Sequence, residues 1–175
     1  MWLVLMLFAG GEMALADGLW NGFPRQIPAG GTDGVVYELK PGYCALHGGL
    51  LPTDEAVEVF EPEGIAILRG TPPASLATGQ VLSPVYGPKI GDGLACPTGQ
   101  LFIRFRQGER VEAHRAELEQ AGFRIAEVLE YAPQAAWLRA RSGSLAEALS
   151  GVSRLRAIAG VEGVEVQFLR RREHR

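Results

Sequence analysis

The sequence predicts an α+β protein built from two units, and three observations support this prediction. Residues 1–99 contain 10 of the 11 prolines, so the composition changes near residue 100. The charge changes at the same place, because residues 1–99 carry 4 Lys or Arg against 10 Asp or Glu, whereas residues 100–175 carry 13 Arg against 10 Glu. Strand-like and helix-like periods alternate clearly only after residue 100.

The overall composition excludes several classes of protein. Of the 175 residues, 47% are hydrophobic and 8% are aromatic, which argues against a disordered tail. Mean hydropathy is near zero, at +0.06, which argues against a membrane protein with many spans. The formal net charge of −3 argues against a protein that coats nucleic acid.

The first 16 residues are typical of a signal peptide. An apolar run extends from Trp2 to Gly11, and Ala14-Leu15-Ala16 provides a small-x-small cleavage signal. The run is about 10 residues, well short of the ~20 that span a bilayer, so no stable membrane span is expected. We therefore expect an exported, periplasmic or secreted protein. No Lys or Arg precedes the run, and the alternative is a buried N-terminal hydrophobic element.

Residues 17–99 are expected to form a small β-rich unit. Residues 17–35 are rich in Gly and Pro and suggest an extended lead-in, and residues 70–99 suggest a long connection. Strand-like runs lie at 35–39, 56–60 and 64–69, separated by turn residues. In an exported protein the two cysteines, Cys44 and Cys96, predict a disulfide. The alternative is two unrelated buried thiols, and no metal site is expected because too few ligands are present.

Residues 100–169 are expected to form a second domain, followed by a basic tail at 170–175. Alternating runs predict strands at 101–106, 123–131, 135–141 and 161–169. Helical spacing predicts helices at 110–121 and 144–159, which end at Gly122 and Gly160. Ser144 and Glu147 form a capping box at the second helix. The order predicts a ferredoxin-like β-α-β-β-α-β sandwich with both helices on one face of the sheet.

Alternation along these strands assigns residues to the two faces of the sheet. The inward set is Leu101, Ile103, Phe105, Ala136, Leu138, Val164, Val166 and Phe168. The outward set that we expect to bind a partner is Phe102, Arg104, Arg106, Trp137, Arg139 and Glu165. Exposed aromatic residues among arginines often mark a binding surface. The alternative is that Phe102 and Trp137 pack against the N-terminal unit.

Residues 101–169 resemble the subtilase propeptide, which also occurs as the free-standing I9-type inhibitor. The resemblance is carried by the strand LFIRFRQG, the helix end EQAGF, the strand pair AEVLEYAPQAAWLRA, and Val161, Val164 and Glu165 in AIAGVEGVEVQ. It implies that the open sheet face packs on a subtilisin-like serine protease, which the domain inhibits or helps to fold. It also implies that a C-terminal tail enters the active-site cleft.

The residues that correspond to this tail are Leu169, Arg170, Arg171, Arg172, Glu173, His174 and Arg175. No protease domain follows them in this sequence, so the domain would act in trans. The tail departs from the usual pattern because it is strongly basic, which would suit a protease with acidic subsites. The alternative is a solvated, frayed terminus.

No convincing catalytic constellation is present, and we expect a binding protein without a cofactor rather than an enzyme. His47 lies in a Gly-rich segment with no Gly-x-Ser-x-Gly nucleophile motif elsewhere, and His114 is expected to border the core. RRM domains share the predicted topology and use sheet aromatics, but the RNP1 pattern is absent, so no nucleic-acid partner is expected.

Two functions follow as expectations. The first is a module that inhibits or chaperones a subtilisin-like protease. The second is a structural or assembly protein of the bacterial envelope that uses the same sheet face on another protein. A neighbouring gene for a subtilase without its own prodomain would distinguish them best.

Overall fold

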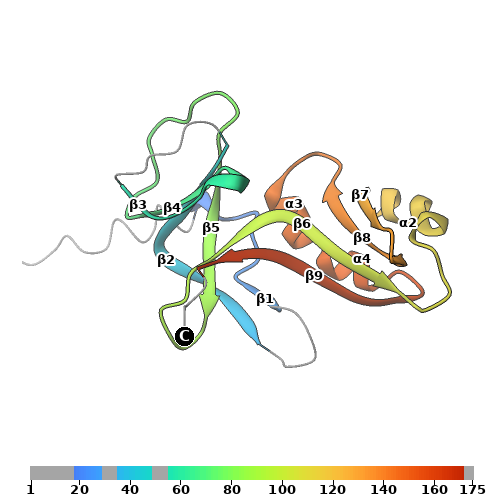
Figure 1. Cartoon of the computed structure of the whole chain (residues 1–175). Coiled ribbons are helices and arrows are strands. Elements are labelled where there is room, and N and C mark those ends of the chain that lie inside the picture. The colour runs from blue at the N-terminus through green and yellow to red at the C-terminus, as the bar shows by residue number, and fades with distance from the viewer. Residues whose placement is uncertain (1–17, 29–34, 49–54, 172–175) are drawn as a thin grey trace, which may run out of the picture.

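The computed structural model describes residues 18–28, 35–48 and 55–171 (Figure 1). Their strands form one nine-stranded sheet in the order β3-β4-β2-β5-β6-β8-β7, in which β1 also pairs with β2 and β9 also pairs with β6. Every pairing is antiparallel. The predicted signal peptide, residues 1–16, lies outside the described residues, and none of the described helices is long and apolar enough to cross a membrane.

The N-terminal half contributes mainly strands. They are β1 (Gln26–Pro28), β2 (Val36–His47), β3 (Ala56–Phe60), β4 (Ile65–Arg69) and β5 (Val81–Pro88), with the 3₁₀ turn η1 (Glu61–Glu63) between β3 and β4. The predicted runs at 35–39, 56–60 and 64–69 fall on β2, β3 and β4. The expectation of a long connection over residues 70–99 was wrong, because β5 and the start of β6 lie there.

The C-terminal half alternates strands and short helices. The elements are β6 (Ala95–Phe105), η2 (Val111–His114), α2 (Arg115–Gln120), β7 (Phe123–Leu129), β8 (Ala132–Ala140), α3 (Leu145–Ser150), α4 (Val152–Arg156) and β9 (Val161–Arg170). The predicted capping box is confirmed in its first half, because the Ser144 Oγ accepts a 3.3 Å hydrogen bond from the backbone N–H of Glu147. The second half differs, because the Glu147 carboxylate accepts from the Ser142 hydroxyl and the Ser144 N–H donates to that hydroxyl. The second predicted helix is divided into α3 and α4 at Gly151.

The predicted fold class was wrong, because the two halves do not form a separate ferredoxin-like sandwich and a small β-rich unit. β6 begins before residue 100 and pairs with β5 at Tyr86 and Ala95. β9 continues to Arg170, which lies opposite Ala95. Figure 1 shows β6 and β9 running from the region of β2 and β5 to the helical region. The strands are longer than the sequence pattern indicated, so a single sheet extends through both halves.

The core also crosses the predicted boundary. All members of the predicted inward set lie in or against the main core, which confirms that prediction. The same cluster includes Ile27, Tyr37 and Tyr86 from the N-terminal half. The Tyr86 hydroxyl donates a 2.8 Å hydrogen bond to the carbonyl of Pro24, which belongs to the expected lead-in. Shared apolar burial therefore stabilises both halves together.

The predicted disulfide between Cys44 and Cys96 was also wrong. Both thiols are free and buried. Cys44 packs with Leu46 in one core cluster, whereas Cys96 packs with Val85 in another. β5 lies between the strands that carry the two cysteines. Two strand spacings amount to about 10 Å, and a disulfide requires Cα atoms within about 7 Å.

Candidate protein-binding surface

The sheet of the C-terminal half has one face that the helices leave uncovered. α2, α3 and α4 pack on the opposite face, where Leu118, Leu149 and Leu155 are buried against the strands. Figure 1 shows β6 and β9 in front of α3 and α4. Alternation along the strands places seven charged or aromatic residues on the uncovered side, which we call the open face. These are Phe102, Arg104, Arg124, Glu127, Trp137, Arg139 and Glu165.

An aromatic pair occupies the middle of the open face. Phe102 on β6 lies directly opposite Trp137 on β8, and their ring centroids are 5.4 Å apart with an interplanar angle of 63°. This edge-to-face geometry is the favoured one for aromatic pairs. Both side chains are half-buried, so the rings are held in place while part of each remains accessible. Among the described residues of the N-terminal half, none buries either ring completely.

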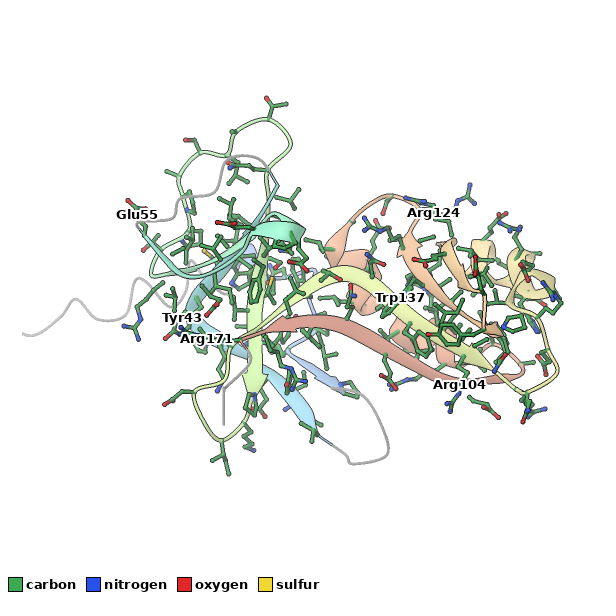
Figure 2. The ribbon with its side chains drawn as sticks, viewed as in Figure 1. Tyr43, Glu55, Arg104, Arg124, Trp137 and Arg171 are labelled. Carbon is green, nitrogen blue, oxygen red and sulfur yellow. The ribbon has the colours of Figure 1, made fainter. Side chains whose placement is uncertain are left out.

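Charged residues surround the aromatic pair. Glu127 on β7 lies opposite Trp137, and Glu165 on β9 lies opposite Phe102. The aromatic pair is therefore flanked by a carboxylate on each side, across the four strands. Arg104 forms a 3.4 Å ion pair with Glu162 between its Nε and the carboxylate Oε2. Trp137 lies between Arg124 and Arg104 (Figure 2). An apolar centre with a polar rim is the usual arrangement of a protein interface.

The structure brings together five of the six predicted face residues. Arg106 is the exception, because β6 ends at Phe105 and Arg106 lies in the following turn. Sequence analysis missed Arg124 and Glu127, which β7 contributes. The signal was present, since Arg124 alternates with the core residues Phe123 and Ile125. A bulge at residue 126 then shifts the alternation and places Glu127 on the same face.

Of the seven residues predicted to form a substrate-like tail, the structure describes Leu169, Arg170 and Arg171. Leu169 pairs with Cys96 and Arg170 pairs with Ala95, so both belong to β9. The guanidinium of Arg170 donates a 2.8 Å hydrogen bond to the hydroxyl of Tyr37. Arg171 lies 3.5 Å from the Glu58 carboxylate. Arg172, Glu173, His174 and Arg175 lie outside the described residues.

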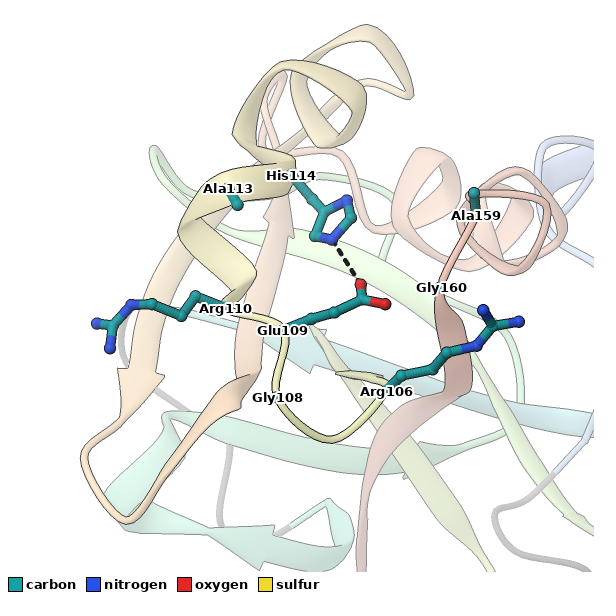
Figure 3. Close-up of a pocket in the computed structure, with 8 residues that line it drawn as sticks. All are labelled: Arg106, Gly108, Glu109, Arg110, Ala113, His114, Ala159 and Gly160. Atoms are coloured by element: carbon teal, nitrogen blue, oxygen red, sulfur yellow. Dashed lines mark hydrogen bonds and ion pairs between the residues drawn. The ribbon is translucent and has the colours of Figure 1, made fainter.

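A shallow hollow of about 480 Å³ lies beyond the end of β6. His114 is one of the residues that line it: its Nε2 is 2.8 Å from the Glu109 Oε2, and its ring stacks on that of Phe105 with the centroids 4.0 Å apart. Arg106 and Arg110 line opposite sides (Figure 3). The described residues place no hydroxyl or thiol nucleophile among its lining residues. The Glu109–His114 contact ties the turn after β6 to η2.

A second polar cluster joins three reactive side chains, from β2, β5 and the start of β6. The His47 Nε2 lies 2.8 Å from the Ser83 Oγ and 3.8 Å from the Cys96 Sγ. Burial lowers the pKa of His47 to about 4 and raises the pKa of the Cys96 thiol to about 12. Ser83 has no exposed surface. A protonated thiol and a covered hydroxyl are poor nucleophiles, so this cluster has the character of a satisfied buried polar group.

Within the described ranges, no group of three or more His, Cys, Asp or Glu residues is arranged to hold a metal ion. Comparisons with models of protein families, with curated proteins and with solved structures find no match to this chain.

Proposed function

We propose that this protein acts as a protein-binding module and that the open face is its contact surface. The Phe102–Trp137 pair carries the proposal, because two large aromatic rings are held edge to face in the middle of an uncovered sheet. Aromatic residues at the centre of a polar surface supply most of the binding free energy in many interfaces.

Binding without catalysis is the function that the chemistry of the chain supports best. Each of the two histidine clusters lacks an activated nucleophile: the pKa of the Cys96 thiol is raised, and Glu109 and His114 bond to each other. Neither cluster lies on the open face. The proposed module therefore needs no cofactor.

The proposed partner is a subtilisin-like serine protease or, as the alternative, another protein of the bacterial envelope. The sequence resemblance to subtilase propeptides supports the protease. The contacts of Leu169, Arg170 and Arg171 count against entry of those three residues into a cleft, because they are already paired within the sheet or with Glu58. A protease complex would therefore use the open face, with the cleft blocked at most by residues beyond Arg171.

The proposal is tested by comparing Trp137→Ala with a matched control. Tyr131→Ala removes an aromatic ring that is 86% exposed at the turn between β7 and β8, away from the aromatic pair. Tagged chains are purified from the source organism, and co-purifying proteins are quantified by mass spectrometry. Truncation at an interface centre typically costs ≥ ~2 kcal/mol, or about 30-fold in affinity. We expect a partner to remain with wild type and Tyr131→Ala and to be lost with Trp137→Ala.

The same proteins separate the two classes of partner. If the partner is a subtilisin-like protease, wild type and Tyr131→Ala should inhibit its hydrolysis of a chromogenic peptide, and Trp137→Ala should inhibit it far less. A partner retained equally by all three chains would contradict the proposed contact surface.

A further inference from the structure

Two arginines face each other directly on the open face. Arg124 on β7 is the register partner of Arg139 on β8, and both side chains are exposed. Side chains directly opposite in an antiparallel pair have Cβ atoms about 4.5–5.5 Å apart, and like charges in that arrangement destabilise the sheet. Folding alone therefore gives no reason for this pair.

The charge of these two arginines is not neutralised within the described part of the chain. Arg104, on the same face, has an ion pair with Glu162. Neither Arg124 nor Arg139 has such a partner among residues 18–28, 35–48 and 55–171. Two guanidinium groups thus point from adjacent strands toward a solvent that a bound protein would displace.

The residues next to the arginine pair indicate what kind of anion could bind there. Arg139 is two residues from Trp137 on β8, so the guanidinium pair borders the aromatic centre. Glu127 and Glu165 flank that centre on both sides and would repel a polyanionic chain such as a nucleic acid. A partner segment with a single carboxylate next to an apolar residue would fit both pairs. The carboxylate would bind the two arginines, because arginine binds carboxylate oxygens through a planar, bidentate fork, and the apolar residue would pack on the aromatic rings.

We propose that Arg124 and Arg139 together bind one Asp or Glu side chain of the partner protein, next to an apolar side chain that packs on Phe102 and Trp137. This inference rests on the proposed function, since it names the chemistry that the open face selects. The partner segment is thus acidic and apolar in adjacent positions.

Selection from a phage library of random 12-residue peptides tests the inference without knowledge of the partner. The immobilised proteins are wild type, Trp137→Ala, the double variant Arg124→Gln/Arg139→Gln, and the control Lys89→Gln/Arg115→Gln. The control removes two exposed positive charges from the β5–β6 turn and from α2, away from the open face. Each variant is first checked for a cooperative thermal transition.

Wild type and the control should enrich peptides that pair Asp or Glu with an apolar residue, and the double variant should lose the acidic preference. A selected peptide should bind wild type about 10-fold more tightly than its Glu→Gln or Asp→Asn version, and the difference should shrink in 300 mM NaCl. The carboxylate inference would be overturned if wild type did not enrich acidic peptides, or if the double variant enriched them as strongly as wild type. If Trp137→Ala selects the same peptides as wild type, the proposed contact surface fails as well.

The free protein gives an independent result. Arg124→Glu places a carboxylate opposite Arg139, and an opposite-charge pair directly across two strands stabilises a sheet. We expect Arg124→Glu to raise the thermal midpoint by about 1–3 °C while abolishing binding of the selected peptide. Retained peptide binding by this variant would contradict the inference even if the midpoint rises.

Discussion

At the scale of single residues, the buried polar cluster of His47, Ser83 and Cys96 shows how packing sets chemistry. Ser83 donates a 3.2 Å hydrogen bond to the Pro84 carbonyl, so its oxygen is free to accept the N–H of a neutral His47 at 2.8 Å. Protonation of His47 would bury a charge beside a thiol with a raised pKa. No sequence motif indicated the contact, because the three residues lie on three different strands.

This cluster predicts a pH dependence of folding. The pKa of His47 is about 4 in the folded protein against an ordinary 6.5, so the unfolded chain binds the proton more strongly. The contribution of His47 to the free energy of unfolding is therefore fully present above about pH 6.5 and is lost as the pH drops toward 4. We expect this residue to remove about 2 kcal/mol of the free energy of unfolding between pH 7 and pH 4.5.

Urea unfolding of wild type and His47→Gln at both pH values measures this contribution. His114→Gln is the control, because His114 lies between Glu109 and Glu117 in the other half of the chain. The loss of stability in acid should be smaller in His47→Gln and should persist in His114→Gln. Equal losses in wild type and His47→Gln would show that burial of His47 does not govern the acid response.

At the scale of elements, periodicity predicted most strands and the core face of the C-terminal half. It did not predict that the helix after Ser144 would be divided at Gly151. A Cβ at Gly151 would lie 2.5 Å from the Cζ of Phe123, so a side chain at this position would require the Phe123 ring to move. The pairing of Arg124 with Arg139 was not predicted, since a cross-strand partner depends on register and not on local pattern.

The tight contact at Gly151 predicts an unusual effect of a helix-favouring substitution. Gly151 has a φ of −81°, which alanine adopts without strain, and Gly→Ala in a helix usually stabilises by about 0.5–1 kcal/mol. Here we expect Gly151→Ala to destabilise by about 1–3 kcal/mol through overpacking. The combination with Phe123→Leu should cost less than the sum of the two single changes in a double-mutant cycle. A higher thermal midpoint for Gly151→Ala would contradict this view of the contact.

At the scale of the whole molecule, the sheet joins the acidic and the basic halves of the sequence. The composition break near residue 100 suggested separate units, but composition does not report which strands pair. The Tyr86–Ala95 pairing and the Arg170–Tyr37 hydrogen bond both cross the expected boundary. The disulfide prediction failed because it, too, depended on the pairing of strands: β5 lies between the strands that carry the two cysteines, which belong to different core clusters. The pair of cysteines therefore gives no evidence of an oxidising compartment.

A continuous sheet and a shared core predict that the two halves unfold together. Differential scanning calorimetry should give one transition, with a calorimetric enthalpy equal to the van't Hoff enthalpy. A chain restricted to residues 95–171 should lose the packing of Tyr37 and Tyr86 and be less stable than the full chain. Two resolved transitions in the full chain would mean that the halves are independent.

The open face as a protein-binding surface is tested most directly by site-specific photo-crosslinking in the source organism. A photoreactive phenylalanine derivative replaces Glu165, which is exposed on the open face, or Glu119, which is exposed on α2 on the helical side. The probe at residue 165 should yield a discrete adduct with one partner protein, and the adduct should disappear when Trp137→Ala is added to the same chain. Crosslinking from residue 119 but not from residue 165, or an adduct from residue 165 that persists with Trp137→Ala, would contradict the assignment of the open face as the binding surface.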